Sequence, residues 1–197
     1  MTTVVAGSLA VLASSLEGVD SSDVVGVPTA AAFTGAPAAA MAVAGALEGV
    51  AGSVEALMVT DRASASEPYF ASRVAAATLV VLADGSPLHA RSVWRDTPVG
   101  DALRGSGALV AVGGVATALF DVMVDPRGGA PTIGLGWRSG LVVTVPGPAD
   151  GLARTRALLG PDVDLVVVGP TGVVRGDGGR WEWAGDVVPG VGGGDAG

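Results

Sequence analysis

The feature that most constrains the fold is a series of short apolar runs rich in valine and leucine. The runs cover residues 24–28, 54–59, 78–82, 108–112, 141–145 and 165–168. Each has the length of a strand buried on both faces, which reads as continuous apolar sequence rather than as an alternation. These runs therefore predict strands at the centre of a sheet.

Stretches that favour helices lie between these runs. They cover residues 37–50, 67–76, 87–94, 98–104, 115–124 and 150–159. Alternation of strand and helix is typical of α/β proteins. Hydrophobic residues make up 49% of the chain and charged residues 15%, so the chain can bury a sizeable core. We predict a three-layer, doubly wound, mostly parallel sheet with helices on both faces.

The C-terminal part has a different pattern. Residues 172–175 and 181–183 flank a Gly176-Asp177-Gly178-Gly179 segment, and an Asp-Gly pair is a strong signal for a hairpin turn. Trp181 and Trp183 would share one face of the last strand, where they either cover the core or form a contact with a second copy or a protein partner. We expect one domain over residues 1–190 and a flexible Gly-rich tail over 191–197.

Charge and composition exclude several classes of function. The net charge is -8 and the basic residues are all arginine, which argues against nucleic acid and anionic membranes as partners. The chain has no cysteine and only His89, which excludes thiolate catalysis, disulfides and a multi-histidine metal site on one chain. We expect neither a metal nor a cofactor.

No targeting or membrane segment is expected. Residues 1–18 carry no basic region ahead of their apolar stretch, unlike a secretory signal, so we predict a cytoplasmic protein. Residues 24–47 are uncharged, but prolines and glycines interrupt them, including Pro28 and Pro37. That punctuation favours strand, loop and helix over a membrane span.

In open α/β sheets, ligands bind beyond the carboxyl ends of the strands. The loops after Leu82, Val112 and Val145 are therefore the places to look for a site. The segment after Val112 reads Gly113-Gly114-Val115-Ala116-Thr117-Ala118. It has the form of a tight strand-to-helix turn that holds a nucleophile and leaves backbone N–H groups free to bind an oxyanion, but it has no nucleophile at its apex.

The order of these segments resembles the cyanophycinase and α-aspartyl dipeptidase family of serine exopeptidases, whose fold is like that of class I glutamine amidotransferases. The resemblance spans residues 24–186. It is carried by Val25-Gly26-Val27-Pro28-Thr29-Ala30, by residues 79–97 with Asp84-Gly85-Ser86, by Gly113 to Ala118, and by Gly134-Leu135-Gly136 with residues 142–146. These resemble, respectively, a strand with a Pro-Thr-Ala turn, a Gly-Gly-Asp loop with its helix, Gly-x-Ser-Ala-Gly-Ala, and Gly-Leu-Gly with a strand ending Val-Pro-His.

Carrying the family's active site over residue by residue yields no catalytic group. Val115 matches the nucleophilic serine and Gly147 the catalytic histidine, and residues 169–172 supply no acid. Asp84 matches the first glycine of the oxyanion loop, where a carboxylate would repel an oxyanion. We expect a catalytically inactive, peptidase-like protein with a binding, scaffold or regulatory role. Its vestigial, more apolar pocket is predicted to contain Asp84, Gly85, Gly113, Gly114, Val115, Ala116 and Gly147.

Two other functions stay open. The resemblance alone implies a serine exopeptidase that hydrolyses aspartyl peptide bonds. Alternatively, the fold binds an unidentified small metabolite through Asp84, Thr117 or Arg138, near the place where the family has its active-site cleft. Ligand binding would then raise the melting temperature.

Several local patterns have a functional and a structural interpretation. His89 with Ser86 or Ser92 and Asp84 or Asp96 could form another triad, whereas Ser86 followed by Pro87 is equally typical of a helix N-cap. Asp121 and Asp125 could hold a cation or could be solvated acids at a helix end. Gly113-Gly114 could bind a phosphate at a helix N-terminus, although no P-loop pattern accompanies it.

Overall fold

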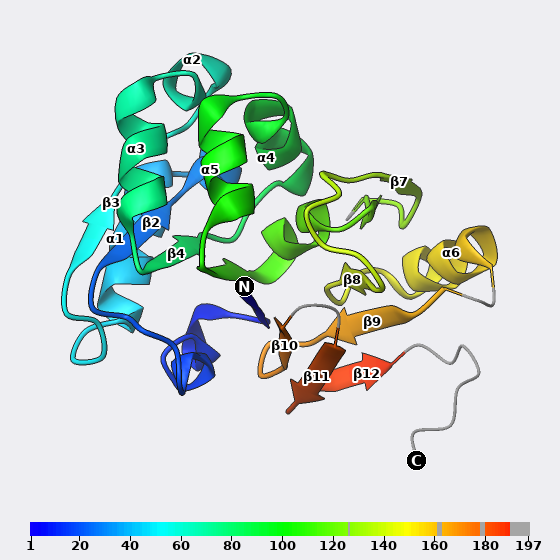
Figure 1. The fold of residues 1–197 in the computed structure, drawn as a ribbon. Helices are drawn as coiled ribbons and strands as arrows, with labels where there is room; N and C mark the ends of the chain where they lie inside the picture. The colour runs from blue at the N-terminus through cyan, green and yellow to red at the C-terminus, as the bar shows by residue number, and fades with distance from the viewer. Residues whose placement is uncertain (126, 161–162, 178–179, 190–197) are drawn as a thin grey trace.

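The computed structural model describes residues 1–125, 127–160, 163–177 and 180–189 (Figure 1). Its main sheet has seven strands in the order β11-β10-β1-β5-β4-β2-β3. Their bounds are β1 Thr2–Ala6, β2 Val24–Val27, β3 Val54–Ala56, β4 Leu79–Leu82, β5 Ala108–Val112, β10 Val173–Asp177 and β11 Arg180–Ala184. Strands β1 to β5 pair in parallel with one another. Strand β10 pairs antiparallel with β1, and β11 pairs antiparallel with β10. The predicted α/β fold with a mostly parallel sheet is confirmed.

Helices cover both faces of this sheet because its strands are apolar on both sides. Val80 and Leu82 of β4 belong to one buried cluster together with Trp94, and the intervening Val81 belongs to a second cluster together with Leu47. The first face carries α2 Arg62–Ala65, α3 Pro68–Ala76, α4 Pro87–Trp94 and α5 Pro98–Gly105, and the second carries α1 Ala36–Ala46 and the 3-10 turns η1 Leu9–Val11 and η2 Ser14–Leu16. Figure 1 shows these two groups above and below the sheet, which is the expected three-layer arrangement.

The runs at 141–145 and 165–168 form strands, but not in the main sheet. They are β8 Val142–Thr144 and β9 Leu165–Val168, which pair in parallel, and β12 Val187–Pro189 pairs antiparallel with β9. The crossover between β8 and β9 is α6 Ala149–Leu159. The place beside β1 is taken by β10, so the expectation of one parallel sheet through all the runs is corrected to a main sheet and a smaller one.

The predicted helix over 115–124 is wrong. Gly113–Leu119 form a 3-10 turn, η4, and the chain then enters β6 Val122–Val124, which pairs with β7 Pro131–Ile133. The hydroxyl of Thr117 accepts a hydrogen bond from the N–H of Val124 at 2.9 Å, which holds the chain where it doubles back. The β-branched residues of β6 also favour a strand. Asp121 and Asp125 therefore flank a strand instead of ending a helix.

Two further elements concern the ends of the chain. The sequence predicts no strand at the N-terminus, whereas the structure has β1 there, inside the main sheet between β5 and β10. The predicted hairpin is present as β10 and β11, and its turn residues 178–179 lie outside the described residues. The ring of Trp181 packs 5.4 Å from that of Phe120, whereas Trp183 is 46% exposed. The predicted tail over 191–197 also lies outside the described part of the chain.

The apolar segment 24–47 folds as β2, the 3-10 turn η3 Thr29–Ala31 and α1, as its punctuation indicates. Within the described residues, the structure has no helix with both the length and the apolar character needed to cross a membrane.

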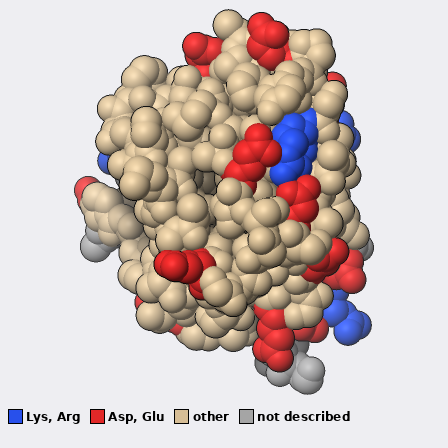
Figure 2. Space-filling model, turned by 90° about the vertical axis from the view of Figure 1, so that its left-hand side faces the viewer, with Lys and Arg blue, Asp and Glu red and all other residues tan. Residues whose placement is uncertain are grey.

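The face of the molecule on the β3 side carries more acidic than basic side chains (Figure 2), in line with the net charge of -8. Arg73 of α3 joins this edge of the sheet to its helix layer. It donates to Asp23, just before β2, and to Glu55 of β3, at 2.6 Å each. The hydrogen bond from Arg73 lowers the pKa of Asp23 below its usual 3.8. Ionised Asp23 therefore stabilises the fold at neutral pH.

Replacing Arg73 with methionine is expected to lower the melting temperature by a few degrees at neutral pH. The stabilisation from ionised Asp23 is complete above 3.8 and is lost as the pH falls through the lower folded-state pKa. The gap between wild type and Arg73→Met should therefore narrow in acid. Thermal melts at neutral and acidic pH test this, with the exposed Arg104→Met as the matched control. A gap that stays constant with pH would contradict the assignment.

Candidate functional site

The carboxyl ends of β4 and β5 lie side by side, because the two strands are parallel and Leu82 pairs in register with Ala111. The loop after β4 contains Asp84 and Gly85, and the loop after β5 begins with Gly113 and Gly114. Ligands of open α/β sheets bind at such an edge. These two loops are therefore the first candidate for a functional site.

Gly113 makes a sharp turn directly after β5. Its φ is +62°, a left-handed conformation that glycine adopts without steric cost. A Cβ added here would lie 2.4 Å from Cγ of Asp84. The turn therefore depends on glycine for both its backbone conformation and its close approach to Asp84.

The carboxylate of Asp84 lies between two backbone donors. Its Oδ1 accepts hydrogen bonds from the N–H of Gly85 at 2.7 Å and from the N–H of Gly114 at 2.8 Å. Two N–H groups converging on one oxygen form the arrangement that stabilises an oxyanion. Here the protein's own carboxylate occupies that arrangement. A Cβ at Gly85, whose φ is +150°, would lie 2.3 Å from the carbonyl oxygen of Ala30, so the loop needs glycine there too.

The structure brings together Asp84, Gly85, Gly113 and Gly114 from the predicted vestigial pocket. Val115 and Ala116 have no exposed surface and belong to the hydrophobic core. Gly147 lies in the loop between β8 and α6, where it lines a pocket that includes none of the other six residues. Since Val115 is enclosed by core side chains, it does not share an open pocket with Gly147.

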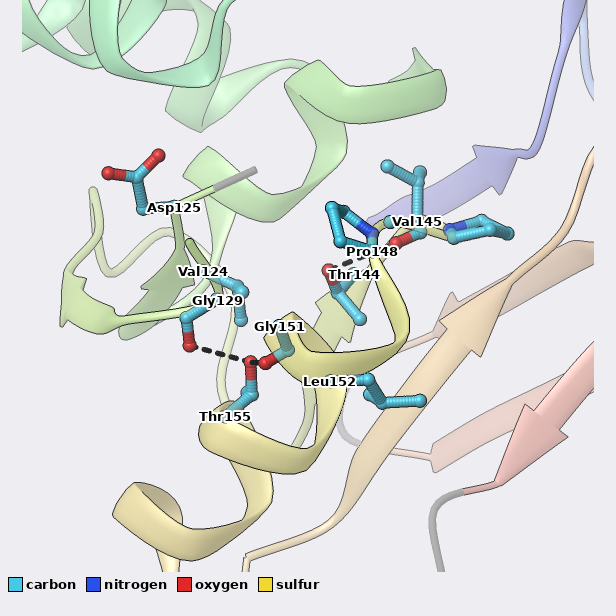
Figure 3. A pocket seen from close by; sticks show the side chains of 11 residues that line it. Val124, Asp125, Gly129, Thr144, Val145, Pro148, Gly151, Leu152 and Thr155 are labelled. Atoms are coloured by element: carbon cyan, nitrogen blue, oxygen red, sulfur yellow. Dashed lines mark hydrogen bonds between the residues drawn. The ribbon is translucent and has the colours of Figure 1, made fainter. Parts of the chain in front are cut away.

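Gly147 is one of the residues that line a small pocket, which Figure 3 shows from close by. Its volume is about 30 Å³, and its lining includes Thr144, Gly147, Leu152 and Thr155. The Oγ1 of Thr155 lies 2.6 Å from the carbonyl oxygen of Gly129, which joins α6 to the loop after β6. Asp125 is at the rim, and Figure 3 shows its carboxylate pointing away from the threonines. The enclosed part of this pocket has room for a few water molecules.

The alternative triad around His89 is not assembled. Nε2 of His89 lies 2.8 Å from the carbonyl oxygen of Thr60, and its ring packs edge-on against Phe33. Ser86 Oγ accepts from the N–H of His89 and caps α4, and the hydroxyl of Ser92 donates to a backbone carbonyl. Among the described hydrogen bonds, neither serine contacts the imidazole. The N-cap interpretation of Ser86 and Pro87 is confirmed.

The residues considered for metabolite or cation binding do not converge. Thr117 is buried, and its hydroxyl accepts a hydrogen bond from the N–H of Val124. Arg138 contacts Thr3 near the start of β1, at the opposite end of the strands from Asp84. Asp125 Oδ1 accepts from the N–H of Arg127 and lies 3.6 Å from its guanidinium. Over the part of the chain that the structure describes, no three acidic or histidine side chains gather where they could hold a metal.

The protein therefore has an α/β fold in which two backbone N–H groups, at the carboxyl ends of β4 and β5, donate to the carboxylate of Asp84. Solved structures of peptidases share this fold. A peptidase from an acI-B1 Actinobacterium superposes with a TM-score of 0.72 at 18% identity, covering 94% of this chain and 88% of that one. A protein described as a candidate peptidase E from Listeria monocytogenes EGD-e gives 0.68 at 11% identity, covering 93% and 97%. No protein-family model and no curated protein sequence matches the chain.

Proposed function

We propose that this protein uses a peptidase fold for binding and does not hydrolyse peptides. The observation that carries the proposal is the position of the Asp84 carboxylate on the N–H groups of Gly85 and Gly114. An oxyanion site accelerates acyl transfer only if its donors are free to meet the charge that develops on the substrate. A resident carboxylate takes up those donors and repels a second negative charge.

The turn after β5 also supports the proposal, because its apex offers no nucleophile and the hydroxyl of Thr117 is buried and accepts from the N–H of Val124. Gly113, the left-handed residue, has no side chain, and Val115, the residue matched to serine by resemblance, is aliphatic and buried. Neither can attack a carbonyl carbon. The proposal therefore holds whichever of the two residues corresponds to the nucleophile.

The third line of support is that, among the described hydrogen bonds, no histidine contacts these loops. The only histidine of the chain, His89, directs Nε2 toward the carbonyl of Thr60. The loop after β9, residues 169–172, contains no acidic residue, and the carboxylate beside it belongs to Asp186, where a Cβ added at Gly169 would lie 1.9 Å from Oδ2. A serine nucleophile needs a base within hydrogen-bond reach and usually a group that orients the base.

The competing function is a serine exopeptidase acting on aspartyl peptides. It is favoured by the likeness of the fold to solved peptidases. A fold alone does not establish an activity, since catalysis depends on the side chains at the site. The two proposals differ in one measurable respect, which is turnover.

Purified full-length protein is expected to leave a panel of Asp-X dipeptides and β-aspartyl dipeptides intact, at the rate of the buffer blank. Asp84→Gly should also be inactive, because freeing the two donors does not supply a nucleophile. The measurement is amine release followed by chromatography, with a serine dipeptidase as the positive control. Turnover that co-purifies with the wild-type chain and falls in Ser86→Ala would overturn the proposal.

A further inference from the structure

Arg138 is a buried cation with only neutral partners. Its relative exposure is 8%. Its Nε donates to the hydroxyl of Thr3, its Nη1 donates to the carbonyl oxygen of Trp137 at 2.7 Å, and its Nη2 lies 3.5 Å from Sδ of Met1. Among the residues that the structure describes, no carboxylate forms an ion pair with this guanidinium.

A buried charge without a counter-charge is costly, so such groups normally pair with an opposite charge. Burial lowers the pKa of Arg138, but a guanidinium stays protonated at neutral pH. Asp177, which follows Gly176 of the same strand, lies 3.6 Å from the α-amino group of Met1 and forms no ion pair with Arg138. The positive charge of Arg138 is therefore free to attract an anion from solution.

A cavity of about 220 Å³ opens beside Arg138. The residues around it are Met1, Thr3, Trp137, Arg138, Ser139, Gly176 and Trp181. Trp181 is held in place, since its Nε1 donates to the carbonyl oxygen of Ser139 at 3.1 Å and its ring lies over Gly176, where a Cβ would come within 2.4 Å of the indole. The cavity therefore has a preformed aromatic wall next to a buried cation.

We propose that this cavity binds a small carboxylate, with its carboxyl group on Arg138 and its carbon skeleton against the indole of Trp181. Nε and one N–H of Nη1 already donate to the protein, so Nη2, whose partner is only a thioether, offers the most available donors for a ligand. The exposed hydroxyl of Ser139 offers a second donor. One net positive charge with an apolar wall suits a monovalent carboxylate better than a divalent phosphate.

The proposed carboxylate site is separate from the Asp84 loops. Thr3, which contacts Arg138, pairs with Leu109, and Gly113 lies four residues further along the strand direction. At about 3.3 Å per residue that separation is roughly 13 Å. The inference rests on the proposed binding role but not on the lack of peptidase activity, so the two can fail independently.

The test is isothermal titration calorimetry of the full chain with sodium benzoate, with inorganic phosphate and with benzamide, the neutral analogue of benzoate. Benzoate is expected to bind and the other two are not. Arg138→Met should weaken benzoate binding at least about tenfold, because it removes a charge-assisted hydrogen bond. Arg104→Met, at an exposed arginine outside this cavity, should leave it unchanged.

A stability measurement guards against a variant that fails to fold. Without ligand, Arg138→Met should melt no lower than wild type, since the substitution removes a buried unpaired charge. Benzoate should raise the melting temperature of the wild type and leave that of Arg138→Met unchanged. Ser139→Ala provides a second variant at an exposed position, with weakened benzoate binding expected. The carboxylate site would be overturned by any of three results. These are no binding of benzoate to the wild type, equal benzoate affinity of Arg138→Met and wild type, or tighter binding of phosphate than of benzoate. A positive dipeptide assay with normal benzoate binding would overturn only the lack of hydrolysis.

Discussion

Replacing Trp94 with alanine is expected to lower the free energy of unfolding by about 3–5 kcal/mol, the range seen for removal of large buried aromatic side chains. Trp94 is 1% exposed and is among the largest fully buried side chains. Its ring stacks on that of Trp137 at 5.8 Å, and its Nε1 donates to the hydroxyl of Thr29 at 3.1 Å. Alanine would leave a cavity between α4 and the sheet and one unpaired hydroxyl acceptor.

The matched control is Trp183→Ala, because Trp183 is 46% exposed on β11. Its cost should be within about 1 kcal/mol. Trp94→Phe should fall between the two, since it keeps much of the packing and loses the hydrogen bond to Thr29. Chemical denaturation measures all three, and equal losses for Trp94→Ala and Trp183→Ala would contradict the packing described for α4.

The second large effect is expected at Gly7, directly after β1. A Cβ there would lie 1.8 Å from the carbonyl oxygen of Gly169, in the loop after β9, while the N–H of Gly7 donates to Gly172 at 2.8 Å. Both neighbours are backbone and cannot rotate away. Gly7→Ala should therefore destabilise the protein by about 1–3 kcal/mol or more, as overpacking does.

Gly45→Ala is the matched control for this substitution. Gly45 lies in α1, and a Cβ added there meets nothing within 4 Å. Alanine should leave stability unchanged or raise it by about 0.5–1 kcal/mol, because it favours the helical backbone. Denaturant melts that show the same effect for Gly7→Ala and Gly45→Ala would contradict the close contact between the β1 end and the loop after β9.

The predictable part of the fold is the part whose strands are buried on both faces. The runs that became β2, β4, β5 and β9 are continuous in valine and leucine, so their strand character is visible in the sequence. Strand β1 begins with two threonines and was missed, although Val4 and Val5 are as buried as the others. Its burial comes from β5 and β10, which are distant in the chain.

The sequence also predicts a helix over 115–124, where the structure has a 3-10 turn followed by strand β6. Ala116, Ala118 and Leu119 favour a helix locally, and the residues that stop it act from further along the chain. Pairing of β6 with β7 and the hydrogen bond between Thr117 and Val124 are both tertiary. Strands whose stability depends on such pairing are the hardest elements to predict from a single sequence.

For the candidate site, the sequence identified the two loops but not how they interact. Asp84, Gly85, Gly113 and Gly114 were expected in one pocket, and the structure brings them together. The hydrogen bonds from two backbone N–H groups to Asp84 depend on the φ of Gly113, which residue type alone does not specify. The sequence indicates Arg138 as a candidate, but the cavity beside it depends on Met1, Thr3 and Trp181, which are distant from it in the chain.

The measurement that tests the central claim most directly is the intact mass of the wild-type chain after treatment with a serine-reactive fluorophosphonate. A serine peptidase forms a covalent adduct because its base and oxyanion donors activate one hydroxyl. With Asp84 on both donors and no serine at the turn after β5, we predict an unchanged mass and no hydrolysis of aspartyl dipeptides. A stoichiometric adduct on a single serine, with turnover, would contradict the account.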